Sequence, residues 1–72
     1  MKKSKPKKYF GPKPVRIGQE YDVEIREISR RGDGIARIKG FVIFVPNTRI
    51  GDKVRIVIRR IGARYAVGEV IE

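Results

Sequence analysis

The chain of 72 residues contains no cysteine and no histidine. The lack of cysteine excludes disulfide bonds and thiolate metal ligands, so the core must be built from valine, isoleucine and a few aromatic residues. The lack of histidine removes the residue type that most often acts as a general base or binds zinc. We therefore expect a protein that is not an enzyme and that needs no metal or other cofactor.

Long apolar segments are also absent. No run approaches the roughly 18 apolar residues of a transmembrane helix, and the basic N-terminus is not followed by the apolar stretch of a secretory signal. A chain of 72 residues is enough for one small domain. The sequence predicts a cytoplasmic protein that does not contact a membrane.

Acidic residues are few, with 8 Asp and Glu against 18 Lys and Arg, and the net charge is +10. This exceeds the charge of about 2 to 8 that solubility alone requires of a small domain. An excess of this size favours a polyanionic partner, most often nucleic acid. We expect a macromolecular partner of that kind and no small-molecule substrate.

The positive charge is concentrated near the N-terminus. Residues 1–16 contain six Lys, one Arg, three prolines and no acidic residue. The prolines argue against a regular helix or a central strand, so we predict a flexible, disordered or loosely docked arm whose lysines follow phosphates. Residues 17–72 contain nine Arg, two Lys and eight acidic residues, and they are predicted to form the folded body.

The body is predicted to be all-β. Short runs rich in Val and Ile recur about every 8 to 12 residues between glycine-containing turns, and no segment has a helical period. Five short antiparallel strands with tight turns fit a small β-barrel, because closure removes the sheet edges. The predicted strands are residues 20–29, with a bulge near Glu27, and residues 35–38, 41–45, 53–61 and 64–71.

The turn between the second and third of these strands decides which phenylalanine faces the core. Lys39-Gly40 is predicted to be a two-residue hairpin turn, and cross-strand partners share one face of a sheet. Phe41 then faces the core and Phe44 faces outward, whereas a register error would exchange them. The predicted pairs are Ile38 with Phe41, Arg37 with Val42, and Ile35 with Phe44.

The outer surface of the predicted sheet combines aromatic and basic side chains. Alternation along residues 64–71 directs Tyr65 outward, on the same side as Phe44. Exposed aromatic rings among arginines suit single-stranded nucleic acid, since each stacked base contributes about 1–3 kcal/mol. The predicted outer residues are Phe44, Tyr65, Val42, Val57, Val67, Arg37, Arg55, Arg59 and Arg64.

Three short motifs follow one another in the body. They are Gly-Asp-Gly-Ile-Ala-Arg at residues 32–37, Val-Ile-Phe-Val-Pro at 42–46 and Gly-Asp-Lys-Val at 51–54, with Gly40 between the first two. Their order and spacing resemble the TRAM domain family over about residues 17–72. Ile50 departs from the pattern, because the family often has proline there, and this departure concerns the shape of one turn.

The resemblance implies a compact five-stranded barrel, related to OB-folds, that binds RNA. TRAM domains are often appended to enzymes that methylate or methylthiolate tRNA and rRNA. This short chain resembles the free-standing archaeal type, which implies a general RNA binder or RNA chaperone, sometimes linked to growth in the cold. We expect it to act as a monomer on single-stranded regions of RNA, with tRNA or rRNA as the targets. The family adds Phe41 as a second contact, and the candidate RNA-binding residues are Arg37, Lys39, Phe41, Phe44, Arg55, Arg59, Arg64 and Tyr65.

Other interpretations fit the sequence less well. Residues 39–44 are similar to the aromatic strand of an RRM or a cold-shock domain, but they are shorter than the RRM pattern and no helix is predicted. A fixed component of the ribosome or of another ribonucleoprotein particle, and a DNA-directed binder, are the alternative functions. A protein-only adaptor is disfavoured by the charge.

Overall fold

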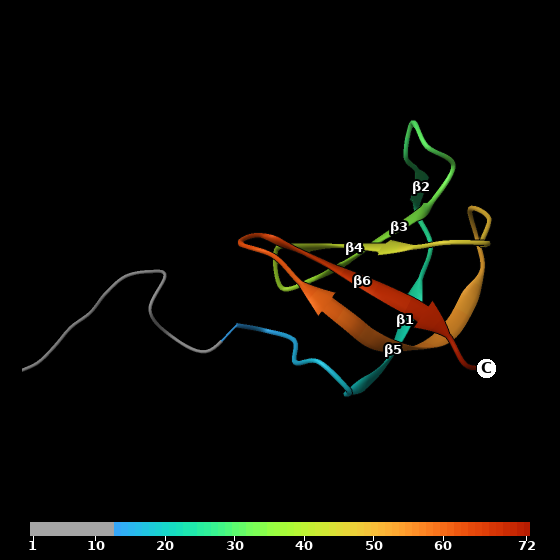
Figure 1. Ribbon diagram of the computed structural model, residues 1–72. Helices are drawn as coiled ribbons and strands as arrows, with labels where there is room; N and C mark the ends of the chain where they lie inside the picture. Colours follow the sequence, from blue (N-terminus) through green and yellow to red (C-terminus); the bar gives the residue numbers. More distant parts are fainter. Residues whose placement is uncertain (1–12) are drawn as a thin grey trace, which may run out of the picture.

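The computed structural model describes residues 13–72, and these residues form six strands in one sheet without a helix (Figure 1). The predicted all-β class is confirmed, although the strand count is six instead of five. Residues 1–12 of the predicted arm lie outside the described residues. The strands are β1 (Glu20–Glu24), β2 (Glu27–Ile28), β3 (Gly34–Ile38), β4 (Phe41–Val45), β5 (Lys53–Ile61) and β6 (Tyr65–Val70).

The additional strand arises because the predicted first strand is interrupted at Ile25 and Arg26. The Ile25 N–H donates to the carbonyl of Asp52, just before β5, at 2.8 Å. The Arg26 N–H donates instead to the carbonyl of Ile35, in β3, at 2.9 Å. The chain therefore leaves one edge of the sheet and joins the opposite edge at this point, near the bulge that the sequence predicts.

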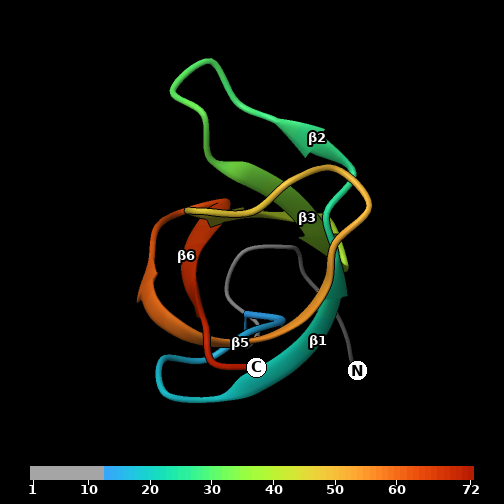
Figure 2. The same ribbon diagram turned by 90° about the vertical axis from the view of Figure 1, so that its right-hand side faces the viewer.

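The sheet has the order β1-β5-β6-β4-β3-β2, so its two edge strands are consecutive in the chain. Figure 2 shows the strands curling around a common interior. The result is a curled open sheet and not a fully closed barrel, because β1 and β2 form no ladder with each other. The prediction of antiparallel strands is wrong for β4 and β6, which pair in parallel. After β4 the chain crosses over to form β5 beside β1, and it then returns as β6 in the same direction as β4.

The core is formed by the inward side chains of the curled sheet. Val15, which lies in the predicted arm, is only 1% exposed and packs with them. The packed part of the chain therefore begins no later than Val15. The buried hydrophobic residues are Val15, Val23, Ile25, Ala36, Ile43, Val45, Ile56, Ile58 and Ala66.

The turn between β3 and β4 has the predicted form. Lys39 and Gly40 have φ angles of 49° and 88°, and two positive φ angles are what a type I′ hairpin turn requires. The three predicted cross-strand pairs are all observed. Phe41 accordingly packs against the core, while Phe44 lies between the buried Ile43 and Val45 in sequence and faces outward, so the predicted register is confirmed.

The turn before β5 anchors the interruption between β1 and β2. Gly51 has a φ of 95°, and the carboxylate of Asp52 accepts the Arg49 N–H at 2.9 Å. The Gly51 N–H donates to the carbonyl of Ile25 at 2.8 Å. Ile50, the departure from the family pattern, is 65% exposed and does not prevent this turn from forming.

Candidate nucleic-acid interface

The register of the sheet aligns outward side chains in a row across four strands. Phe44 of β4 pairs with Ile35 of β3 on one side and with Val67 of β6 on the other, and Val67 pairs with Arg60 of β5. Neighbouring strands are about 4.8 Å apart, so the backbones of Phe44 and Arg60 are separated by roughly 10 Å. The row ends in a cation after three apolar side chains.

A second aromatic ring lies beside this row. Tyr65 is paired in register with Val42, which in turn is paired with Arg37. The ring centroids of Phe44 and Tyr65 are 6.0 Å apart with an interplanar angle of 65°, the edge-to-face geometry that aromatic pairs prefer. Because Tyr65 is 45% exposed, the pair offers aromatic surface to a ligand.

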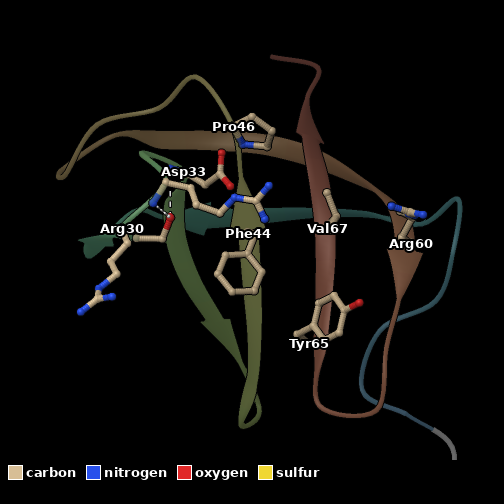
Figure 3. Close-up of a pocket in the computed structure, with 9 residues that line it drawn as sticks. Arg30, Asp33, Phe44, Pro46, Arg60, Tyr65 and Val67 are labelled. Carbon is tan, nitrogen blue, oxygen red and sulfur yellow. Dashed lines mark hydrogen bonds between the residues drawn. The ribbon is translucent and has the colours of Figure 1, made fainter.

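The aromatic pair borders an open pocket with a volume of about 470 Å³. This volume lies within the range of about 300–1,000 Å³ that is typical of small-ligand sites. Figure 3 shows Phe44, Tyr65 and Val67 between Arg30 on one side and Arg60 on the other. The residues that line the pocket are Ser29, Arg30, Arg31, Asp33, Phe44, Pro46, Arg60, Tyr65 and Val67.

The hairpin between β2 and β3 forms one side of the pocket. The hydroxyl of Ser29 accepts the N–H groups of Arg31 and Asp33 at 3.2 and 3.1 Å. Gly32, with a φ of 94°, donates its N–H to the Ser29 carbonyl at 2.9 Å. The Arg-Gly-Asp sequence at 31–33 is therefore part of a tight turn that presents Arg30 and Arg31 at the hairpin tip.

Two of the predicted arginines are held by acidic side chains. A terminal nitrogen of Arg37 lies 3.1 Å from a carboxylate oxygen of Glu27, and Nε of Arg59 lies 2.7 Å from a carboxylate oxygen of Glu69. All four side chains are more than half exposed, and such ion pairs contribute about 0–1 kcal/mol. A phosphate can therefore compete for either arginine.

Arg55 lies on the part of β5 that pairs with the acidic strand β1. Its Nε and Nη1 atoms lie 3.0 Å from carboxylate oxygens of Glu20 and Asp22, respectively. The hydrogen bond to Glu20, followed by that to Asp22, raises the pKa of Arg55 above its ordinary value. Arg55 does not line the pocket beside Phe44, so the structure does not bring it together with the aromatic pair.

The other three predicted residues do not line the pocket. Lys39 is exposed in the β3–β4 turn, and Phe41 is only partly exposed because it packs against the core. Arg64 is exposed directly before Tyr65, and its carbonyl accepts the Val42 N–H at 3.3 Å. Of the eight candidates, Phe44 and Tyr65 are thus the two that form a shared contact surface on the pocket.

Three arginines that line the pocket, Arg30, Arg31 and Arg60, were not predicted. Within residues 13–72 they form no ion pair. Arg60 faces outward because the pairing of β5 with β6 shifts between Ile58 and Arg60, which is the signature of a β-bulge. The sequence contains one signal for this bulge, the consecutive pair Arg59-Arg60. Strict alternation would bury one of the two arginines, and buried arginines are rare.

The functional groups that line the pocket include the guanidinium groups of arginines, two aromatic rings and the carboxylate of Asp33. Residues 13–72 contain no group of three or more Asp or Glu side chains arranged to hold a metal ion. In the same part of the chain, no helix has the length and apolar character needed to cross a bilayer.

Gly62 leaves room for the Tyr65 ring, because a Cβ atom there would lie 2.0 Å from Cε1 of Tyr65. The Gly62→Ala substitution should displace the ring from Phe44. The free energy of unfolding should fall by about 0.5–1.5 kcal/mol, which is the contribution of one aromatic pair. The lower conformational entropy of the unfolded alanine variant should partly offset this loss. We expect a folded protein by circular dichroism that lacks the NMR cross-peaks between the two rings, and retained cross-peaks would contradict this role of Gly62.

A model of the TRAM domain family matches residues 14–71. An uncharacterized protein of Methanocaldococcus jannaschii is 45% identical over 58 residues, which cover 81% of this chain and 75% of that protein. The solution structure of a conserved protein of Methanococcus maripaludis is 38% identical, with a TM-score of 0.82, and the match covers 92% of this chain and 94% of that one. Both are similar to this chain over most of their own length.

Longer relatives share only this region. The ribosomal RNA large subunit methyltransferase E of Methanothrix thermoacetophila is 42% identical over 59 residues, which are 82% of this chain and 23% of the relative. The translation initiation factor 2 subunit beta of Picrophilus torridus is 40% identical over 58 residues, which are 81% of this chain and 28% of the relative. This chain therefore spans about a quarter of each longer relative, and the match is confined to the TRAM region. The predicted resemblance is confirmed, and the chain belongs to the TRAM domain family.

Proposed function

We propose that the protein binds single-stranded RNA, with little preference for base sequence, on the outer face of β4 and β6. The observation that supports this best is the edge-to-face pair of the partly buried Phe44 and the exposed Tyr65 beside an arginine-lined pocket. Every base can stack on an aromatic ring, so stacking binds RNA without reading its sequence. Family membership, together with a relative named as a ribosomal RNA methyltransferase, favours RNA over other polyanions.

In this proposal the aromatic rings of Phe44 and Tyr65 stack on bases and the cations around them neutralise phosphates. Arg37 and Arg59 bind phosphate by exchanging an exposed carboxylate partner for it, which costs little because their ion pairs are weak. Phe41 supports the surface from the core side. The remaining candidates, which raise the local positive potential, are Lys39, Arg55 and Arg64.

Preferential binding to unpaired strands makes the protein an RNA chaperone. Binding lowers the free energy of open RNA relative to misfolded duplexes, so the population shifts toward open forms without ATP. The effect matters most in the cold, where misfolded RNA persists longest. In this proposal the protein acts by binding and not by catalysis, as a monomer in the cytoplasm, on single-stranded regions of tRNA or rRNA.

Replacing Phe44 with alanine tests the stacking surface. We expect RNA affinity to fall roughly 5- to 150-fold, equivalent to about 1–3 kcal/mol for one stacked base, by a similar factor at every salt concentration. The slope of log affinity against log salt should not change, because the ring has no charge. The measurement is fluorescence anisotropy with a labelled single-stranded RNA of about 20 nucleotides.

Phe41→Ala is the matched control, because the Phe41 ring packs against the core and its loss should lower stability before it changes RNA contacts. A folded Phe41→Ala protein with lost affinity, beside an unaffected Phe44→Ala protein, would reverse the assignment of the two rings. Equal binding by all three proteins, with affinity that vanishes at high salt, would show that charge alone holds the RNA.

The same variants test the chaperone activity. The parent protein at stoichiometric amounts should accelerate the melting or annealing of an RNA hairpin, and Phe44→Ala should do so less. A protein that binds RNA but changes neither rate is not a chaperone. Co-sedimentation with ribosomal particles in high salt would favour a fixed particle component, and tighter binding to DNA of the same sequence would favour a DNA-directed binder.

A further inference from the structure

The pocket beside Phe44 has arginines on two opposite sides. Figure 3 shows Arg30 on one side of Phe44 and Val67 and Arg60 on the other. The two arginines come from the β2–β3 hairpin and from β5, which lie far apart in the sequence. An apolar surface between two cations complements one nucleotide, whose base has an apolar face and whose backbone has a phosphate on either side.

Arg60, the cation on the β5 side, faces the pocket because of the bulge in β5. Arg59 and Arg60 both face outward where the pairing with β6 shifts. Arg59 contacts Glu69 at 2.7 Å, whereas Arg60 forms no ion pair within the part of the chain that the structure describes. The two adjacent arginines thus differ in two respects: Arg59 has a carboxylate partner and does not line the pocket, whereas Arg60 lines it.

The cations on the hairpin side are held on a defined backbone. The two hydrogen bonds to the Ser29 hydroxyl fix the turn from which Arg30 and Arg31 extend. Asp33 is the one acidic residue that lines the pocket, so three arginines face a single carboxylate there. The pocket therefore has an excess of positive charge at both ends of its apolar surface.

We propose that this pocket holds one unstacked nucleotide of single-stranded RNA, with its base against Phe44 and Tyr65 and its flanking phosphates at Arg30-Arg31 and at Arg60. The RNA backbone then crosses the strands, from the hairpin over β4 and β6 to β5. The row that joins Phe44, Val67 and Arg60 places the backbone of Arg60 roughly 10 Å from the backbone of Phe44. This inference rests on the proposed function, because it requires RNA on this face.

The adjacent arginines provide a matched test, since Arg60→Ala and Arg59→Ala change the net charge equally. With single-stranded RNA of about 20 nucleotides, Arg60→Ala should reduce the salt slope by about 0.7, the value for one lost phosphate contact on a single strand. Arg59→Ala should also lower the affinity, because Arg59 exchanges its weak carboxylate partner for a phosphate. It should leave any preference for an unpaired nucleotide unchanged, since Arg59 does not line the pocket. The Arg30→Ala/Arg31→Ala double variant should reduce the slope as Arg60→Ala does.

A second measurement tests the single-nucleotide site. The parent should bind an RNA duplex with one unpaired nucleotide more tightly than the fully paired duplex of equal length, and Arg60→Ala should reduce this preference. The proposal is overturned if Arg59→Ala reduces this preference as much as Arg60→Ala does, or if the parent does not distinguish the two duplexes. If Phe44→Ala also binds RNA as tightly as the parent, the proposed function itself fails. If Phe44→Ala binds more weakly but the arginine variants do not behave as expected, the stacking surface stands and the RNA follows another path.

Discussion

The Gly34→Ala substitution should lower the free energy of unfolding by about 3 kcal/mol, at the upper end of the cost of adding a methyl group to a packed core. A Cβ atom at Gly34 would lie 1.9 Å from Oγ1 of Thr48, 3.0 Å from Cγ2 of Ile25 and 3.1 Å from the carbonyl oxygen of Val45. The backbone of Gly34 does not have a positive φ, so the cost is steric and not conformational. The glycine of the family motif is required here by the space that Thr48 occupies.

Thr48 cannot move away without a further loss. Its side chain is buried, at 7% exposure, and its hydroxyl donates to the carbonyl of Val45 at 2.8 Å. Val45 is also the cross-strand partner of Gly34, so the clash and the hydrogen bond share one site. A domain of 72 residues has a total stability of about 4–11 kcal/mol, so a loss of this size leaves a marginal fold.

The measurement is urea unfolding of Gly34→Ala, Thr48→Ala and the double variant. Thr48→Ala removes the nearest clashing atom, so the double variant should be more stable than the sum of the two single losses indicates. Full restoration is not expected, because Ile25 and the Val45 carbonyl are still close to the added methyl group. Strict additivity of the two losses would show that Thr48 is not the obstacle.

The features that the sequence predicted correctly depend on local chemistry. The Lys39-Gly40 turn and the alternation of the strands beside it are properties of a few adjacent residues, and they are sufficient to place Phe41 inward and Phe44 outward. The facing of Tyr65 follows from the same period of two, although its contact with Phe44 depends on the pairing of β4 with β6. The motifs that identified the family lie mainly in β3 and β4 and in the turns that lead into β3 and β5.

The features that the sequence did not predict depend on parts of the chain that meet only after folding. The interruption at Ile25 is stabilised by the turn before β5, and the parallel pairing of β4 with β6 follows from the crossover of β5. The bulge at Arg59 depends on the register between β5 and β6. This bulge directs Arg60 into the pocket. Arg60 was therefore missed, and Arg30 and Arg31 were missed because their hairpin comes to line the pocket only in the folded chain.

The pairing of strands in the folded chain also explains why arginines of equal charge differ in whether a carboxylate holds them. The acidic residues that bind the predicted arginines belong to other strands, as with Glu69 of β6 beside Arg59 of β5. Net charge, which a sequence reports directly, does not distinguish an arginine that a carboxylate holds from one that is open to a phosphate. Only the folded register separates Arg59 from Arg60 in this respect.

Replacing the lysines near the N-terminus with glutamine should have the largest effect on RNA affinity at low salt. Five lysines lie at positions 2, 3, 5, 7 and 8, so the substitution lowers the net charge from +10 to +5. If each lysine neutralises one phosphate, the salt slope on single-stranded RNA should fall by about 3.5. Lys13, which follows these lysines in the sequence, donates a hydrogen bond to the Gly62 carbonyl at 3.0 Å, three residues before Tyr65 in the chain.

The measurement is the anisotropy titration between about 50 and 200 mM salt. Over this fourfold range the parent should lose roughly 100-fold more affinity than the glutamine variant, because the two slopes differ by about 3.5. A variant with the same five lysines replaced by arginine keeps the charge and should keep the slope. Phe44→Ala, in contrast, should lower affinity at every salt without changing the slope, so the two variants separate the contribution of charge from that of stacking. A glutamine variant with the parent slope would show that the arm does not contact phosphates, and the outer face of the sheet would then account for all of the salt dependence.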